Sequence, residues 1–235
     1  MEVLIGSKNP HKLQEIAEIL GDAGVTLRPL PDGAPDVPET GATFEENAAF
    51  KALAWARHFG VAVLADDSGL EVDALGGRPG VVSARYAGPE QDARRNLEKV
   101  LVELHGVPAE RRTARFRCEV ALADPSGVRF RASGACEGRL LDAPRGAGGF
   151  GYDPIFFVEE LGRTFAEADA LQKHALSHRG RALRELSRKL QEAPMDRFVG
   201  EGITFDDVLI VPGRSDLPPK SVDTRTELCR GIALN

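Results

Sequence analysis

The chain has 235 residues, of which 42% are hydrophobic and 28% are charged, as in a globular protein with one large domain or a domain and an appendage. The formal net charge of −6 gives no electrostatic basis for generic nucleic-acid binding, so any polyphosphate must meet a local site. Because no apolar run reaches membrane-spanning length and the first residues lack a basic signal region, we expect a cytoplasmic protein without a membrane partner.

The chain begins with a predicted strand that leads into a helix. The apolar run at residues 3–5 ends at Gly6, and Asn9-Pro10 then supplies a helix cap and a first-turn proline. The turn between this strand and the helix is suited to hold a phosphate. It offers free backbone N–H groups at a helix N-terminus and the side chain of Lys12. A plain strand-to-helix turn capped by Asn9 explains the same residues equally well.

A second helix is predicted over residues 43–59, because Thr43-x-x-Glu46 forms a capping box and Gly60 follows the last apolar position. Glu39, Glu45 and Glu46 are acidic residues around its start, and Asn47 and Lys51 share one helical face. Helix capping would account for the presence of Glu46, and exposure to solvent would account for Lys51. The interest of Glu39 depends on the residues that would lie beside it.

An apolar strand is predicted at residues 61–65, with Asp66-Asp67-Ser68-Gly69 at its carboxyl end, where α/β sheets tend to bind ligands. Two adjacent carboxylates after a buried strand are costly unless they are solvated, hydrogen-bonded or paired with a cation. A Mg²⁺ ion would satisfy them, since it prefers carboxylate oxygens, water and phosphates. The alternative is a turn with an aspartate cap.

The middle of the chain predicts a structural helix over residues 91–105 and an antiparallel hairpin, whose alternating segments 114–122 and 128–132 flank a turn at 124–127. A strand at 155–158 and a helix after Ser177 follow. Together these elements predict an α/β fold with a mixed sheet. The cysteines show no C-x-x-C spacing, so neither a zinc site nor a disulfide framework is indicated.

A glycine-rich loop at residues 146–151 matches G-x-G-x-x-G, but Pro154 and a phenylalanine-rich run follow it, which favours a strand over the helix of a dinucleotide fingerprint. We interpret it as a loop that lets the backbone approach a ligand, with Phe150 or Tyr152 offering a face for a purine. A tight glycine bend with core aromatics is the alternative. The chain has no G-x-x-x-x-G-K-[ST] motif, which argues against P-loop phosphoryl transfer.

Donor side chains gather at the start of the last helix, where Lys173 precedes Ser177-His178-Arg179. Such donors are suited to phosphate or to purine oxygens. A solvated basic helix start is the alternative.

Six segments in this order, spanning residues 1–190, resemble the inosine triphosphate pyrophosphatase family, also called dITP/XTP pyrophosphatases. They are Ser7-x-Asn9-x-x-Lys12, Glu39-Thr40-Gly41-x-Thr43-Phe44-x-Glu46-Asn47-Ala48, Ala65-Asp66-Asp67-Ser68-Gly69-Leu70, Pro79-Gly80-Val81-x-Ser83-Ala84-Arg85-Tyr86, Gly148-Gly149-Phe150-Gly151-Tyr152-Asp153-Pro154-Ile155-Phe156 and Ser177-His178-Arg179-Gly180.

The resemblance implies a homodimer of two-lobed α/β subunits, each with a central ligand cleft. It also implies Mg²⁺-dependent hydrolysis of ITP, dITP and XTP to the monophosphate and pyrophosphate. Asp67 would be metal ligand and water-activating base, and Glu39 the second metal-site acid. The residues implied to bind substrate are Ser7, Lys8, Asn9, Pro10, His11, Lys12, Ser68, Phe150, Gly151, Tyr152, Asp153, Lys173, His178 and Arg179. Donors aimed at O6 would explain a preference for 6-oxo purines.

The pyrophosphatase domain is expected to cover residues 1–192, with a linker beginning at Gln191-Glu192-Ala193-Pro194. Residues 198–235 resemble the N-terminal segment of IMP dehydrogenase, truncated before that family's barrel. We therefore expect no dehydrogenase activity and no nucleophilic role for Cys229. We also expect a poorly ordered tail, unless it docks on the main domain.

Three rival hypotheses remain on the sequence alone. They are a nucleotide-binding protein that does not turn over its ligand, a bifunctional purine enzyme that has lost its dehydrogenase half, and an interaction module built on the tail.

Overall fold

The computed structural model describes residues 2–21, 26–192, 226–229 and 232–234. The chain divides into two compact units, residues 1–193 and 194–235. Within the second unit, the described strands β8 (Thr226–Cys229) and β9 (Ile232–Leu234) pair antiparallel. The other residues of the predicted tail, 193–225, 230–231 and 235, lie outside the described part of the chain.

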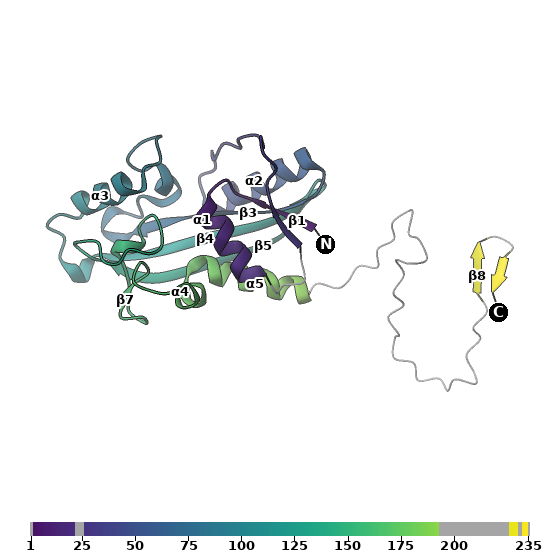
Figure 1. The fold of residues 1–235 in the computed structure, drawn as a ribbon. Coiled ribbons are helices and arrows are strands. Elements are labelled where there is room, and N and C mark those ends of the chain that lie inside the picture. The colour runs from purple at the N-terminus through teal and green to yellow at the C-terminus, as the bar shows by residue number, and fades with distance from the viewer. Residues whose placement is uncertain (1, 22–25, 193–225, 230–231, 235) are drawn as a thin grey trace, which may run out of the picture. The chain divides into compact units, whose positions relative to one another are not determined.

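The first unit is built on a seven-stranded mixed sheet in the order β2-β1-β3-β4-β5-β6-β7 (Figure 1). Strand β1 runs parallel to β2 and β3, whereas the pairs from β3 to β7 are antiparallel. The mixed sheet predicted from the sequence is thereby confirmed. The strands are β1 (Glu2–Gly6), β2 (Thr26–Pro29), β3 (Ala62–Val72), β4 (Thr113–Asp124), β5 (Gly127–Leu140), β6 (Phe156–Val158) and β7 (Arg163–Thr164).

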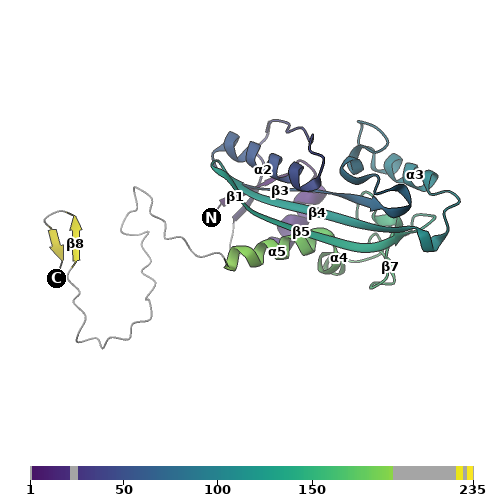
Figure 2. The same ribbon diagram turned by 180° about the vertical axis from the view of Figure 1, so that it is seen from behind.

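Helices cover both faces of this sheet, with α2 on one face and α1 and α5 on the other, as the two opposite views show (Figures 1 and 2). The helices are α1 (Pro10–Leu20), α2 (Phe44–Phe59), α3 (Ala93–Glu103), α4 (Ala170–Leu176) and α5 (His178–Glu192). Short 3₁₀ turns are η1 (Asp73–Leu75), η2 (Gly80–Arg85), η3 (Ala109–Arg111) and η4 (Asp153–Ile155).

The last helix is longer than the sequence predicts. The sequence predicts a linker from Gln191 onward, but Gln191 and Glu192 lie in the final turn of α5. Arg188 pairs with Glu185 and with Glu192 at helical spacings, and such pairs extend a helix past its apolar stripe.

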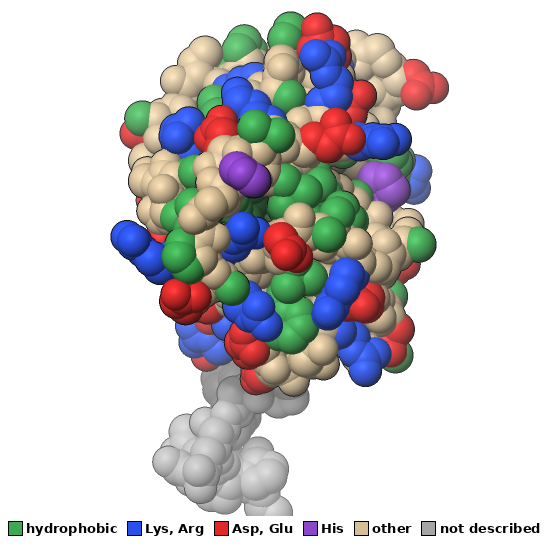
Figure 3. Space-filling view, turned by 90° about the vertical axis from the view of Figure 1, so that its left-hand side faces the viewer, with side chains coloured by type: hydrophobic (Ala, Val, Ile, Leu, Met, Phe, Trp, Pro, Cys, Tyr) green, Lys and Arg blue, Asp and Glu red, His purple; other side chains and the backbone are tan. Residues whose placement is uncertain are grey.

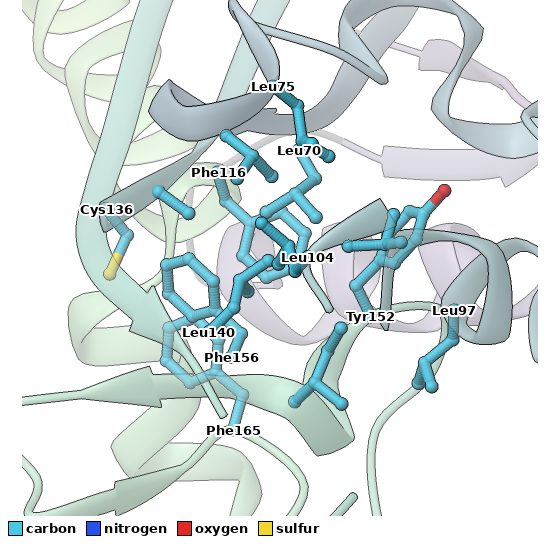
Figure 4. Close-up of a cluster of buried hydrophobic side chains, with 14 of the residues drawn as sticks. Leu70, Leu75, Leu97, Leu104, Phe116, Cys136, Leu140, Tyr152, Phe156 and Phe165 are labelled. Carbon is cyan, nitrogen blue, oxygen red and sulfur yellow. The ribbon is translucent and has the colours of Figure 1, made fainter. Parts of the chain in front are cut away.

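Three buried clusters form the core. One lies under α1 and α5, one lies under α2, and the third fills the end of the unit near α3. In the third cluster the rings of Phe116, Phe156 and Phe165 pack together with the aliphatic side chains of Leu70 and Leu140 (Figure 4). This aromatic packing holds the far halves of β3, β4 and β5 to the loops that follow them.

Strand β3 extends beyond the point where the sequence predicts its end. The sequence predicts residues 66–69 after the strand, but they lie within it, because β4 pairs with β3 continuously from Val63↔Ala123 to Val72↔Ala114. Strand β1, in contrast, stops pairing with β3 at Gly6↔Ala65. From Asp66 onward, β3 therefore has no β1 neighbour on that edge.

Side chains alternate across a strand, so the two adjacent aspartates point to opposite faces of the sheet. Asp66 and Ser68 contact Arg179 of α5, whereas Asp67 contacts Asn47 of α2. Both faces thus supply polar groups beside the β1-free edge of β3.

Helix α5 crosses β5 closely at Gly134. A Cβ on Gly134 would meet the carbonyl oxygen of His178 and, at 2.5 Å, the backbone nitrogen of Ala182. We expect Gly134→Ala to lower the free energy of unfolding by about 1–3 kcal/mol through overpacking, as measured by urea denaturation. Gly127→Ala is the control, because nothing lies within 4 Å of its Cβ position. Equal effects of the two substitutions would contradict the close crossing.

Candidate active site

A cavity of 240 Å³ lies beside the free stretch of β3 and collects residues from α1, the loop before α2, β3, the glycine-rich loop, α4 and α5. The predicted site residues that line it are Asn9, His11, Lys12, Glu39, Asp67, Ser68, Phe150, Gly151, Tyr152, Asp153, Lys173, His178 and Arg179. A second cavity of 480 Å³, lined by Glu45, Glu71 and Glu119 among others, contains none of the predicted site residues.

Three predicted residues do not line the 240 Å³ cavity. Lys8 is tied to a neighbouring loop, because its Nζ donates to the Ala34 carbonyl at 2.7 Å and pairs with Asp36 at 2.6 Å. Ser7 Oγ accepts from the backbone N–H of Asn9 at 3.2 Å, and Pro10 is the first residue of α1. These residues shape the start of the helix, and their contact with substrate stays a prediction.

Asn9 caps α1 as the sequence predicts. Its side-chain oxygen accepts from the backbone N–H groups of His11 at 3.0 Å and Lys12 at 3.4 Å. The cap holds the first turn so that the side chains of His11 and Lys12 reach the cavity.

On the α2 side of the sheet, two carboxylates converge on one ammonium group. Lys51 Nζ lies 2.5 Å from Glu39 Oε1 and 3.6 Å from Asp67 Oδ1. Asn47 donates to Asp67 Oδ2 at 2.9 Å and accepts from the backbone N–H of Gly41 at 2.7 Å. It therefore fastens the loop that carries Glu39 to the strand that carries Asp67.

The two carboxyls of this cluster differ in acidity. Burial raises the pKa of Asp67 above its ordinary value, and the nearby Glu39 adds to the rise, although Lys51 and Lys12 oppose it. Burial acts in the same direction on Glu39, but Lys51, Lys12 and Arg85 outweigh it and lower the pKa of Glu39. Asp67 is thus the more basic of the two groups, as suits a proton acceptor.

On the opposite face, Asp66 is neutralised by side chains rather than by the metal ion that the sequence suggested for the aspartate pair. Its Oδ2 accepts from Arg179 Nη2 at 3.0 Å and lies 3.0 Å from Lys12 Nζ. Burial favours the protonated form, but Lys12 and Arg179 prevail and hold the pKa of Asp66 well below its usual range. The adjacent aspartates are therefore two separate groups.

Glu15 is a buried site residue that the sequence analysis missed. It accepts from Arg179 Nη1 at 2.5 Å and lies 2.6 Å from Lys173 Nζ. The one signal in the sequence is its spacing, because Glu15 follows Lys12 by three positions and so shares its helical face. Lys173 also donates to Asp153 Oδ2 at 2.7 Å, and this oxygen accepts from the backbone N–H of Phe150 at 2.9 Å.

Phe150 and Tyr152 have different surroundings. The half-buried ring of Phe150 stacks on His11 with centroids 5.1 Å apart, and Lys173 Nζ lies 4.7 Å from the centroid of Phe150. The ring of Tyr152 belongs to the buried cluster in Figure 4, and its hydroxyl donates to the Ser83 carbonyl at 2.8 Å. Phe150 is therefore the better candidate for a stacking face.

His178 is buried beside this aromatic face. Its ring stacks on Phe116 with centroids 4.8 Å apart, and its Nδ1 has no hydrogen-bond partner within the described part of the chain. Burial, with help from the cationic Arg179 and Lys173, lowers the pKa of His178 well below its ordinary value. The imidazole is therefore neutral at neutral pH and offers one donor and one acceptor.

In Figure 3, basic and acidic side chains are interspersed over the face shown, without an extended basic area. Across residues 2–21, 26–192 and the described tail strands, no helix is both long enough and apolar enough to span a bilayer.

The cluster around Lys51 fits Mg²⁺. No group of three or more His, Cys, Asp or Glu residues suited to a metal occurs among the described residues. Mg²⁺ needs no such cage, since one or two carboxylates commonly hold it together with water and substrate phosphates. The Lys51 ammonium shows that Glu39 and Asp67 already converge on a cation.

A mixed α/β sheet with converging carboxylates, lysines and an aromatic face in one cavity has the composition of a nucleotide-hydrolysing site. The chain belongs to the Ham1 family, whose model matches residues 3–189.

Curated relatives and solved structures agree with this membership. The dITP/XTP pyrophosphatase of Geobacillus kaustophilus is 50% identical over 193 residues, which cover 81% of this chain and 95% of the relative. That of Geobacter sulfurreducens is 53% identical over 183 residues, covering 77% and 92%. The HAM1 protein from Coxiella burnetii superposes with a TM-score of 0.75 at 43% identity, covering 82% of this chain and all (100%) of that one. The predicted fold and family are thereby confirmed.

Proposed function

We propose that this chain hydrolyses the non-standard purine nucleoside triphosphates ITP, dITP and XTP to the monophosphate and pyrophosphate, and so removes them from the nucleotide pool. The observation that carries this proposal is that Asp67, Lys12 and Phe150 line the same 240 Å³ cavity. Sequence similarity supports the proposal, because the chain is 50% identical to a relative named dITP/XTP pyrophosphatase.

In the proposed reaction, the Asp67 carboxylate accepts a proton from the water that attacks the α-phosphorus. The bond between the α-phosphorus and the bridging oxygen breaks, and pyrophosphate leaves. Lys12 and Lys51 stabilise the charge that develops on the phosphates. Glu39 and Asp67 would hold Mg²⁺, which when bound neutralises phosphate charge and favours ionisation of water.

Selection of the base rests on donors near Phe150. Arg179 has five N–H donors, and it uses two of them on Asp66, one on Ser68 and one on Glu15. One N–H of Nη1 thus has no partner within the described residues. We propose that this donor or His178 meets the 6-oxo group of the purine, since an adenine amino group there would leave the donor unpaired.

The proposal is tested by measuring pyrophosphate released from ITP, XTP, ATP and GTP by the purified chain, with and without Mg²⁺. Fast, Mg²⁺-dependent turnover of ITP and XTP is expected. Direct release of orthophosphate would contradict the proposed cleavage position, and equal turnover of ATP would contradict the proposed base selection. Binding of ITP without turnover would instead favour a nucleotide-binding protein that is not an enzyme.

The raised pKa of Asp67 predicts pH-dependent binding of Mg²⁺. Metal ligands must be deprotonated, and the carboxyl of Asp67 remains protonated to a higher pH than an ordinary aspartate, whose pKa is 3.8. We therefore expect the affinity for Mg²⁺ to fall as the pH is lowered toward the Asp67 pKa, beginning above the range of an ordinary aspartate. Calorimetric titration of the nucleotide-free protein checks this, and Glu39→Gln should weaken binding at every pH. A constant affinity down to pH 4 would contradict the prediction.

The remaining inferences from the family resemblance are that the chain forms a homodimer and acts in the cytoplasm. Light scattering of the purified chain tests the first, and fractionation of cells tests the second. Residues 198–235 are proposed to derive from the opening segment of an IMP dehydrogenase. We expect no NADH to form when the chain is incubated with IMP and NAD⁺, and NADH formation would contradict this expectation.

A further inference from the structure

One buried oxygen atom is shared by two cationic side chains that line the cavity, those of Lys12 and Arg179. Asp66 is 1% exposed, and its Oδ2 lies 3.0 Å from Lys12 Nζ, 3.0 Å from Arg179 Nη2 and 3.2 Å from Ser68 Oγ. Arg179 Nε donates to the same oxygen at 3.3 Å. The groups around Oδ2 therefore include one residue from the first turn of α1 and one from the first turn of α5.

These neighbours belong to different parts of the site. Lys12 lies in the capped first turn of α1, where helix geometry favours phosphate. Arg179 lies on the side of Phe150, with its Cζ 5.9 Å from the ring centroid. Because both cations compete for one oxygen, a shift of either changes the electrostatic environment of the other.

We propose that Asp66 is a positioning residue that couples recognition of the phosphates through Lys12 to recognition of the base through Arg179. This inference rests on the proposed function only for the identity of the substrate. Asp66 faces away from Asp67 and the Lys51 cluster, so it acts through Lys12 and Arg179 rather than on the attacking water.

Two partial ligands test the coupling without hydrolysis. Inorganic tripolyphosphate probes the phosphate end and inosine probes the base end, each titrated calorimetrically at a fixed Mg²⁺ concentration. Lys12→Met should weaken chiefly the binding of tripolyphosphate and Arg179→Lys chiefly that of inosine, whereas Asp66→Asn should weaken both, by about fivefold or more. Asp66→Asn that weakens one partial ligand or neither would overturn the proposal.

A matched control tests whether the loss of affinity is specific to Asp66 or follows from replacing any aspartate that is part of an ion pair. Asp124, the last residue of β4, is paired with Arg129, and its other hydrogen bonds are to Ser126 and Gly127 in the turn that follows. Asp124→Asn should leave both affinities unchanged. An effect equal to that of Asp66→Asn would overturn the specific role of Asp66.

A double-mutant cycle gives a second, kinetic measurement. In the otherwise unmodified chain, the effects of Lys12→Met and Arg179→Lys on kcat/KM for ITP should be non-additive by about fivefold or more, and additive once Asp66→Asn is present. Asp66→Asn should raise KM for ITP, because it acts on both side chains that are proposed to bind the substrate. If Asp66→Asn does not fold, additivity in the unmodified chain still overturns the proposal. If the unmodified chain releases no pyrophosphate, the proposed function fails, while the two titrations still decide the role of Asp66.

Discussion

Asp67→Asn is expected to lower kcat for pyrophosphate release from ITP by about 10²–10⁴-fold, the usual contribution of a positioned general base. The amide cannot accept the proton from water at neutral pH. It also weakens the carboxylate pair with Glu39 that is proposed to hold Mg²⁺. Steady-state kinetics at saturating Mg²⁺ measure the loss.

The same substitution should not unfold the protein. Burial raises the pKa of Asp67, which means that the folded state disfavours its charge, and a neutral amide of the same shape removes that cost. The midpoint of denaturant unfolding should therefore stay equal or rise. A variant that is folded and retains full activity would show that another group accepts the proton.

Arg179→Ala is expected to lower the free energy of unfolding by about 3–5 kcal/mol, the cost of removing one partner from a buried ion pair. Arg179 is 1% exposed, and its removal leaves Asp66 and Glu15 buried with one cation fewer each. Lys12 and Lys173 remain as their partners. Urea or guanidinium unfolding at pH 7 measures the change.

Arg188→Ala on the same helix is the matched control. Arg188 also pairs with two glutamates, but its side chain is 53% exposed, and pairs of this kind contribute about 1 kcal/mol or less. A small effect at both positions would mean that the buried pairs of Arg179 are replaced by solvent or rearrangement when the arginine is lost.

Much of the fold follows from periodicity and punctuation in the sequence. The helix after Asn9-Pro10, the helix opened by Thr43 and the antiparallel hairpin all occur where they are predicted, because caps, glycines and alternation act locally. The end of β3 could not be predicted in this way. Asp66-Asp67-Ser68-Gly69 has a turn-like composition, and only the long-range pairing with β4 makes it a strand.

The candidate site was predictable where it coincides with motifs, and less so where charges meet through space. Glu39, Asp67, Phe150 and Lys173 line one cavity as the family resemblance implies. The contacts of Glu15 and the separation of Asp66 from Asp67 depend on which face of an element meets which helix. A single sequence does not contain that information locally.

The alternation of β3 makes its register part of the chemistry. A substitution within the strand changes one side chain. Inserting one residue between Ala65 and Asp66 has a larger effect. If the rest of the β3–β4 pairing is kept, the polar residues on one side of the insertion move to the opposite face of the sheet. The carboxylate of Asp66, which pairs with Lys12 and Arg179, would then point toward α2. This stretch of chain should therefore tolerate changes of residue type better than changes of length, and homologous sequences aligned here are expected to lack insertions and deletions.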